Sequence, residues 1–109
     1  MSNLADLLTE AKGYATRGRC IGAVARDGAG TRCLYDDARA ACWCPVGAIA
    51  RAISDRNMWN AAWHLLYCVV NKQGWSGIVV WSEAHERTLE DIGAAFDAAI
   101  LRAKESEAS

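Results

Sequence analysis

The stretch Trp43-Cys44-Pro45-Val46-Gly47-Ala48 predicts where the main helical part of the chain begins. Proline is favoured at the first position of a helix and disfavoured inside one, so Pro45 indicates a helix start with Cys44 as its N-cap. Apolar side chains then recur at helical spacing, which predicts a buried face made by Ala48, Ile49, Ala52 and Ile53. We interpret the stretch chiefly as a packing junction between an upstream hairpin and the core helices.

Apolar spacing predicts three further helices, over residues 4–15, 58–72 and 89–103. The middle one is apolar on nearly every side, which is typical of the central helix of a core, and Asn57 is its expected N-cap. Thr88 and Asp91 resemble a capping box at the start of the last helix. A polar, frayed tail is expected from about residue 104.

Three short segments are predicted to be strands. Cys20–Ala25 and Thr31–Tyr35 flank a run of turn-forming residues and are expected to pair as a β-hairpin. Ile78–Trp81 is a continuous apolar run rich in β-branched residues, which predicts a buried third strand. A brief helical turn is expected through Ala41. The fold class is therefore α+β: one helix-rich domain over residues 1–109, with a small two- or three-stranded antiparallel sheet.

The composition excludes several function classes. The 109 residues, 52% hydrophobic and 23% charged, suffice for one core. A net charge of −1 provides no long-range field, so neither nucleic acid nor a membrane surface is an expected partner. The first residues lack the pattern of a signal peptide, and no apolar run is long enough to cross a bilayer. Five cysteines without a recurrent disulfide framework indicate free thiols and a cytoplasmic location.

Arginines concentrate between Arg17 and Arg56 and are interleaved with aspartates. Arg17 and Arg19, beside the predicted hairpin, are candidates for binding an anion or an acidic protein surface. The alternative, which we favour, is a solvated surface whose charges pair with one another. Trp75, near two glycines in a predicted loop, is a candidate either for anchoring a protein partner or for packing in the core. The candidate binding residues together are Arg17, Arg19, Arg26, Trp75, Glu83 and Arg87.

Cys44 is also the best candidate for a catalytic nucleophile. Backbone N–H groups and the helix dipole at a helix start favour the thiolate form of a cysteine. A nucleophile needs a base within hydrogen-bond reach, and His85, after the predicted third strand, is the better of the two histidines for that role. The competing interpretation is that Cys44 is a small apolar side chain packed in the core and that His85 is simply exposed to solvent.

Four cysteines lie within the segment from Cys20 to Cys44, and zinc binds four thiolates well. Their spacings lack the paired Cys-x2-Cys knuckles that are typical of structural zinc sites. Separate small hydrophobic side chains in strands and at a helix start are the more common arrangement. We therefore expect no metal site and no cofactor.

Four motifs recur in a familiar order: Ala25-Arg26-Asp27 before a turn, Trp43-Cys44 leading into Gly47-Ala48, the apolar run ending at Trp81, and Arg87-Thr88 before the last helix. Their order and spacing, from about residue 17 to residue 103, resemble a family of small proteins of actinobacteria and their phages that is known as a domain of unknown function. In that family Asn and Asp follow the tryptophan, where this chain has Ser82 and Glu83. The resemblance points to Cys44, Glu83, Arg87 and Thr88 as positions of interest.

The resemblance implies a small accessory protein carried by a phage or prophage. With no complete catalytic set in the sequence, the leading expectation is a non-enzymatic protein that binds and blocks or modulates a host or defence protein. The alternative is a thiol-dependent hydrolase or transferase that uses Cys44 and His85.

Overall fold

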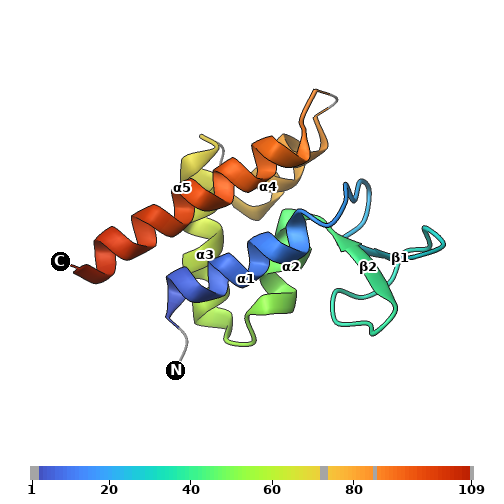
Figure 1. The fold of residues 1–109 in the computed structure, drawn as a ribbon, viewed down its shortest axis with the longest axis horizontal. Coiled ribbons are helices and arrows are strands. Elements are labelled where there is room, and N and C mark those ends of the chain that lie inside the picture. The colour runs from blue at the N-terminus through green and yellow to red at the C-terminus, as the bar shows by residue number, and fades with distance from the viewer. Residues whose placement is uncertain (1–2, 72–73, 85, 109) are drawn as a thin grey trace.

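The computed structural model describes residues 3–71, 74–84 and 86–108, and within them five helices and a two-stranded antiparallel sheet. This confirms the predicted helix-rich α+β fold. The elements are α1 (Leu4–Ala15), β1 (Ala25–Asp27), β2 (Ala40–Trp43), α2 (Pro45–Ala52), α3 (Arg56–Val69), α4 (Gly74–Glu83) and α5 (Leu89–Ala108). The strands lie at one end of the molecule, and α5 runs along the body formed by the other helices (Figure 1).

The helices bury small and apolar residues against one another. The inward face of α1 carries Ala5, Leu8, Ala11 and Ala15 at spacings of three and four, and α1 packs on both α2 and α5. Phe96 of α5 is fully buried in the same core. At the surface the ammonium of Lys12 donates to the Asp97 carboxylate at 2.8 Å, which links α1 to α5. Small residues on α1 therefore allow the close approach around which the core is built.

The predicted start of α2 is confirmed. Cys44 is the N-cap of α2 and Pro45 its first residue, and the Cys44 sulfur accepts a hydrogen bond from the Gly47 N–H at 3.3 Å. The Cys44 N–H donates to the Val24 carbonyl at 3.1 Å. A Cβ added to Gly47 would lie 2.1 Å from that same carbonyl oxygen. The junction therefore requires glycine at residue 47, because the backbone of Val24 occupies the space of a side chain.

The pairing of the sheet differs from the predicted hairpin. β1 pairs with β2, with Ala25 opposite Trp43, and residues 20–24 form a loop in place of a strand. The predicted second strand, Thr31–Tyr35, contributes an isolated bridge from Arg32 to Arg26, flanked by backbone hydrogen bonds of 2.9 and 3.1 Å to β1. Arg26 pairs both with Arg32 and with Cys42, so β2 adds to the other edge of β1, where the sequence predicts a brief helical turn. The predicted hairpin therefore forms only around Arg26 and Arg32, and the predicted helical turn is wrong from Ala40, where β2 begins.

Trp43 provides the physical reason for this pairing. Its indole is buried against the ring of Tyr14, with ring centroids 4.8 Å apart, and its Nε1–H donates to the Tyr35 carbonyl at 2.8 Å. These contacts hold the end of β2 against α1 and place it beside β1. Tertiary packing thus outweighs the local turn signals of residues 36–41.

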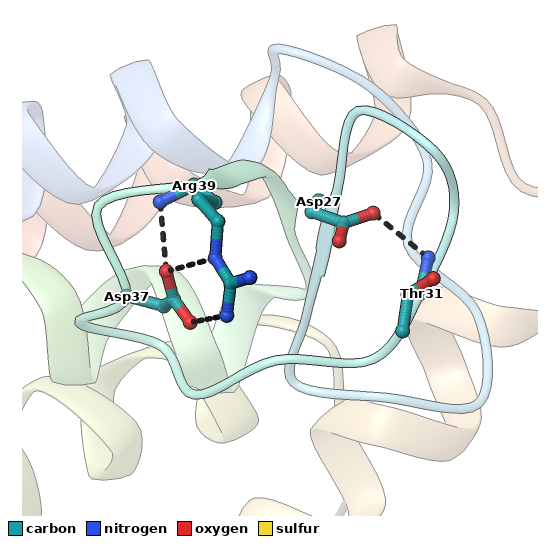
Figure 2. Close-up of polar contacts among 4 residues, drawn as sticks. All are labelled: Asp27, Thr31, Asp37 and Arg39. Carbon is teal, nitrogen blue, oxygen red and sulfur yellow. Dashed lines mark hydrogen bonds and ion pairs between the residues drawn. The ribbon is translucent and has the colours of Figure 1, made fainter.

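Acidic side chains shape the loops that join β1 to β2. The Asp27 carboxylate accepts from the N–H groups of Ala29 and Thr31, and Asp37 accepts from both the backbone and the guanidinium of Arg39 (Figure 2). The hydrogen bonds from Arg39 hold the pKa of Asp37 below its usual value. This part of the arginine-rich segment is self-paired, as the favoured interpretation of the sequence expects.

The predicted third strand is wrong, because residues 78–81 are helical within α4. Ile78 and Ser82, one helical turn apart, are buried together, and the Ser82 hydroxyl donates to the Val79 carbonyl at 3.0 Å. A short continuous apolar run has the same pattern in a buried strand and in a buried helix. Here the run packs against α2 and α3, away from the sheet, and only the helix satisfies its backbone hydrogen bonds there.

Two other helix starts complete the comparison with the sequence. The N-cap of α3 is Asp55, not the predicted Asn57: the Asp55 carboxylate accepts from the Asn57 N–H at 2.8 Å. The capping box of α5 is confirmed, since the Thr88 hydroxyl accepts from the Asp91 N–H at 3.1 Å and Asp91 accepts from the Thr88 N–H at 3.0 Å. α5 continues as helix through Ala108, beyond the start of the predicted frayed tail.

Candidate functional site

Cys44, the predicted nucleophile, is a buried structural thiol. Its side chain is only 3% exposed, and burial raises the pKa of the thiol, although hydrogen bonds from the N–H groups of Gly47 and Val46 act in the opposite direction. A thiol that stays protonated and screened from solvent is a poor nucleophile. His85, its proposed base, lies outside the described residues. The geometry of Cys44 therefore argues for helix capping and packing and against catalysis.

Cys20 resembles Cys44 in this respect, because it is also buried. Burial, together with a hydrogen bond to Cys42, raises the pKa of the Cys20 thiol to about 12. The Cys20 sulfur also lies 3.5 Å from the Ala23 carbonyl, as a weak donor. Across the described ranges, no group of three or more His, Cys, Asp or Glu side chains is placed to hold a metal ion. The chemistry of these thiols is that of small packed side chains.

Arg19 and Arg87, two candidate binding residues, meet at the end of α4. The guanidinium of Arg19 donates to the Ser82 carbonyl at 2.8 Å and to the carbonyl of Arg87. Arg87 in turn donates from Nε to the Trp81 carbonyl at 3.0 Å, and its guanidinium lies over the Trp81 ring, 4.3 Å from the centroid. Both side chains therefore satisfy the carbonyl groups at the end of α4.

Glu83 completes this set of contacts. Its carboxylate accepts from the backbone N–H of Gly22 at 2.7 Å, which fastens the loop of residues 19–24 to α4. Gly22 has a positive φ of 78°, a conformation that glycine adopts at little cost. The structure thus brings together Arg19, Glu83 and Arg87, which are distant in the sequence, and uses them to hold the loop in place.

Arg17 is a packing residue as well as a surface charge. Its guanidinium lies over the rings of Tyr14 and Trp43, at 4.8 and 5.4 Å from their centroids. Arg51 covers the Tyr14 ring from α2 at 5.3 Å. These cations cover the aromatic side chains that anchor β2. Trp75, the candidate anchor, has a side chain outside the described part of the chain.

Arg26 and Arg32 form a positive patch beside the loop of residues 19–24. Arg26 donates to the carbonyls of Ile21 and Gly30, at 2.9 and 2.8 Å, whereas Arg32 is exposed. A nitrogen of each guanidinium lies within 4 Å of the point that a Cβ on Gly22 would occupy. In the described part of the chain no carboxylate is within 4.0 Å of either group. Two adjacent cations without an ion-pair partner attract an anionic group.

Arg32 is a site residue that the sequence analysis misses. The predicted hairpin places it in a strand without giving it a role. Its bridge to Arg26 brings the two guanidiniums together. The available signal was the turn of residues 27–31, which brings Arg26 and Arg32 opposite each other.

A shallow, largely apolar hollow lies next to this patch. It is lined by Gly22, Ala23, Val24, Cys44, Val79 and Glu83, from the loop of residues 19–24, the α2 junction and α4. Val24, which lines the hollow, is 41% exposed, and two exposed apolar residues adjoin the lining residues in the sequence: Ile21, 50% exposed, precedes Gly22, and Val80, 68% exposed, follows Val79. Monomeric proteins seldom concentrate large exposed apolar side chains without a reason. We call the hollow with these adjoining residues the loop–α4 surface.

Comparison with known proteins gives a family and no function. A model described as a family of unknown function, DUF6197, matches residues 1–102. No curated protein and no solved structure is significantly similar to the chain. No described helix is both long enough and apolar enough to cross a membrane.

Proposed function

The chain belongs to the DUF6197 family, a family of unknown function, and from that premise we propose that it acts by binding another protein at the loop–α4 surface. The observation that carries the proposal is one apolar hollow, lined by Val24 and Val79, that lies beside a positive patch. Apolar residues surrounded by polar ones are typical of protein-binding surfaces. The hollow is too shallow and open to enclose a small molecule as a deep pocket does.

The chemistry of the surface selects the kind of partner. Arg26 and Arg32 provide guanidinium groups near Gly22, and Val24 and Val79 provide apolar lining for the hollow, which Gly22 also lines. A complementary segment carries carboxylates next to a large apolar side chain. The carboxylates pair with the arginines while the apolar side chain enters the hollow. We therefore propose an acidic segment of a partner protein, with one large apolar residue, as the occupant.

The contacts of Arg19, Glu83 and Arg87 support this proposal because they fix the shape of the surface before binding. The Gly22 N–H and the end of α4 are held by charged groups from distant parts of the chain. A surface that is already ordered loses less conformational entropy when a partner binds. Substituting these three residues is expected to weaken binding indirectly, through the shape of the loop.

The broader proposal is a small cytoplasmic accessory protein, of the kind encoded by phages or prophages, that blocks or modulates a host or defence protein. The order of the motifs at residues 25–27, 43–48, 81 and 87–88 and the small size of the chain support it. The buried state of Cys44 leaves the alternative of a thiol hydrolase at that residue without structural support.

Selection from a library of displayed peptides tests the binding proposal. The expected result is enrichment of sequences that place Asp or Glu within a few residues of Leu, Ile, Phe or Trp. Binding of an enriched peptide is expected to fall at least about tenfold in the double variant Arg26→Glu/Arg32→Glu, because a desolvated charge pair contributes on the order of 1.5–3 kcal/mol.

The matched control is Arg56→Glu/Arg102→Glu, which changes the net charge equally at two exposed positions of α3 and α5. This control is expected to bind like the original chain, apart from a small long-range effect of charge that salt screens. Equal loss in both double variants, or the absence of any acidic–apolar enrichment, would contradict the proposal.

A further inference from the structure

A second cluster of reactive groups lies on α3, away from the loop–α4 surface. Cys68 is exposed, and its sulfur is 3.8 Å from Nε2 of His64, one helical turn earlier. The other ring nitrogen of His64, Nδ1, is 2.8 Å from the Tyr67 hydroxyl, and the two rings lie edge to face with centroids 5.1 Å apart. The imidazole therefore stands between a thiol and a hydroxyl, with one nitrogen directed to each.

This order of groups suits activation of a thiol. When the proton of neutral His64 is on Nδ1, that nitrogen donates to the Tyr67 oxygen and Nε2 is free to accept the proton of Cys68. Tyr67 then fixes the tautomer and the orientation of the ring, as the third member of a nucleophile–base arrangement does. His64, Tyr67 and Cys68 stand at positions i, i+3 and i+4 of α3, the spacing that places side chains along one side of a helix.

Because of its position in α3, Cys68 depends on the imidazole of His64 to form a thiolate. Cys68 lies in the last turn of α3, which ends at Val69, and the dipole at the C-terminal end of a helix disfavours an anion. Transfer of the thiol proton to His64 produces a thiolate whose charge is balanced by the imidazolium beside it. His64 is therefore the group beside Cys68 that accepts the thiol proton.

We propose that Cys68, His64 and Tyr67 form a reactive-thiol site that takes disulfides as its substrate class. The thiol proton moves to Nε2 of His64, and the Cys68 thiolate attacks one sulfur of the disulfide. A new S–S bond forms to Cys68 as the original S–S bond breaks. The leaving thiolate takes the proton from the imidazolium, so a mixed disulfide and one free thiol result, with no other oxidant.

An apolar hollow beside His64 indicates which disulfides fit. It lies between α3 and the ends of α1 and α5, and its lining includes Leu4, Ala61, His64, Leu65 and Ala103. A disulfide with an apolar or aromatic substituent is able to place that group near the imidazole while its sulfur faces Cys68. We therefore expect neutral aromatic disulfides to react well.

The test uses 4,4′-dithiodipyridine on the native full-length chain, with peptide mapping by mass spectrometry to identify the modified cysteine. Cys68 is expected to react first, well before the buried Cys20 and Cys44. His64→Asn is expected to slow the reaction of Cys68 about tenfold, since it removes the proton acceptor. Tyr67→Phe is expected to slow it less, because the base remains and only its orientation is lost.

The control is Asn60→Ala, an exposed position one turn before His64 on the same helix, which is expected to leave the rate unchanged. Circular dichroism establishes that each variant is folded, and His64→Gln provides a second variant if His64→Asn is not. An unchanged rate in the folded His64 variant, or a fast phase that maps to Cys33 or Cys42, would overturn the proposal.

Discussion

Gly47→Ala is expected to lower the free energy of unfolding by about 3 kcal/mol, which is a large effect for a substitution that adds one methyl group. The added Cβ would lie 2.1 Å from the Val24 carbonyl oxygen and 2.9 Å from the Val24 carbonyl carbon. These are backbone atoms, and the same carbonyl accepts the Cys44 N–H. The loop of residues 19–24 must therefore shift, and the hydrogen bond at the start of α2 is disturbed with it. Urea denaturation followed by circular dichroism measures the change.

Gly13→Ala is the matched control for this substitution. Gly13 lies within α1, is exposed, and an added Cβ there meets no atom within 4 Å. Alanine is a better helix former than glycine, so a gain of about 0.5–1 kcal/mol is expected. Similar small changes at both glycines would mean that Val24 does not approach Gly47 as closely as described.

Trp43→Ala is expected to lower the free energy of unfolding by about 3–5 kcal/mol, the range for truncating a large buried aromatic residue. Trp43 is 3% exposed and packs on Tyr14, and its indole N–H donates to the Tyr35 carbonyl. Its loss removes the contact that holds β2 against α1. Chemical denaturation and the disappearance of near-ultraviolet circular dichroism from this aromatic cluster are the measurements.

Two further variants separate the parts of this effect. Trp43→Phe keeps an aromatic ring but leaves the Tyr35 carbonyl without its donor, so a smaller loss of about 1–3 kcal/mol is expected. Leu34→Ala, in the adjoining loop and 70% exposed, is expected to change stability by no more than about 0.5 kcal/mol. A Trp43→Ala variant as stable as Leu34→Ala would contradict the described role of Trp43 in the fold.

Local rules account for the parts of the fold that are predictable. A proline at the first helical position, a capping cysteine and a Thr-x-x-Asp box act within a few residues, so the starts of α2 and α5 follow from the sequence. The choice between strand and helix for Ile78–Trp81 depends on which elements surround the segment. In this chain α2 and α3 surround it, and its own composition does not reveal that.

The candidate site depends still more on distant contacts. Arg19 and Glu83 are conspicuous in the sequence as charged residues, but their partners lie 63 and 61 residues away along the chain. A surface arginine and an arginine that satisfies buried carbonyls have the same local pattern. The proximity of Arg26 and Arg32, by contrast, is local, because the two residues form an antiparallel bridge across the turn that begins at Asp27.

The central claim is that the loop–α4 surface is where a partner protein binds. Backbone amide chemical shifts, measured by nuclear magnetic resonance while an enriched acidic–apolar peptide is added, test it most directly. The predicted result is saturable shifts that are largest for residues 21–24, Arg26, Arg32 and residues 79–83. Saturable shifts centred on the exposed face of α3 or on Leu101 of α5, with residues 21–24 unchanged, would contradict the claim.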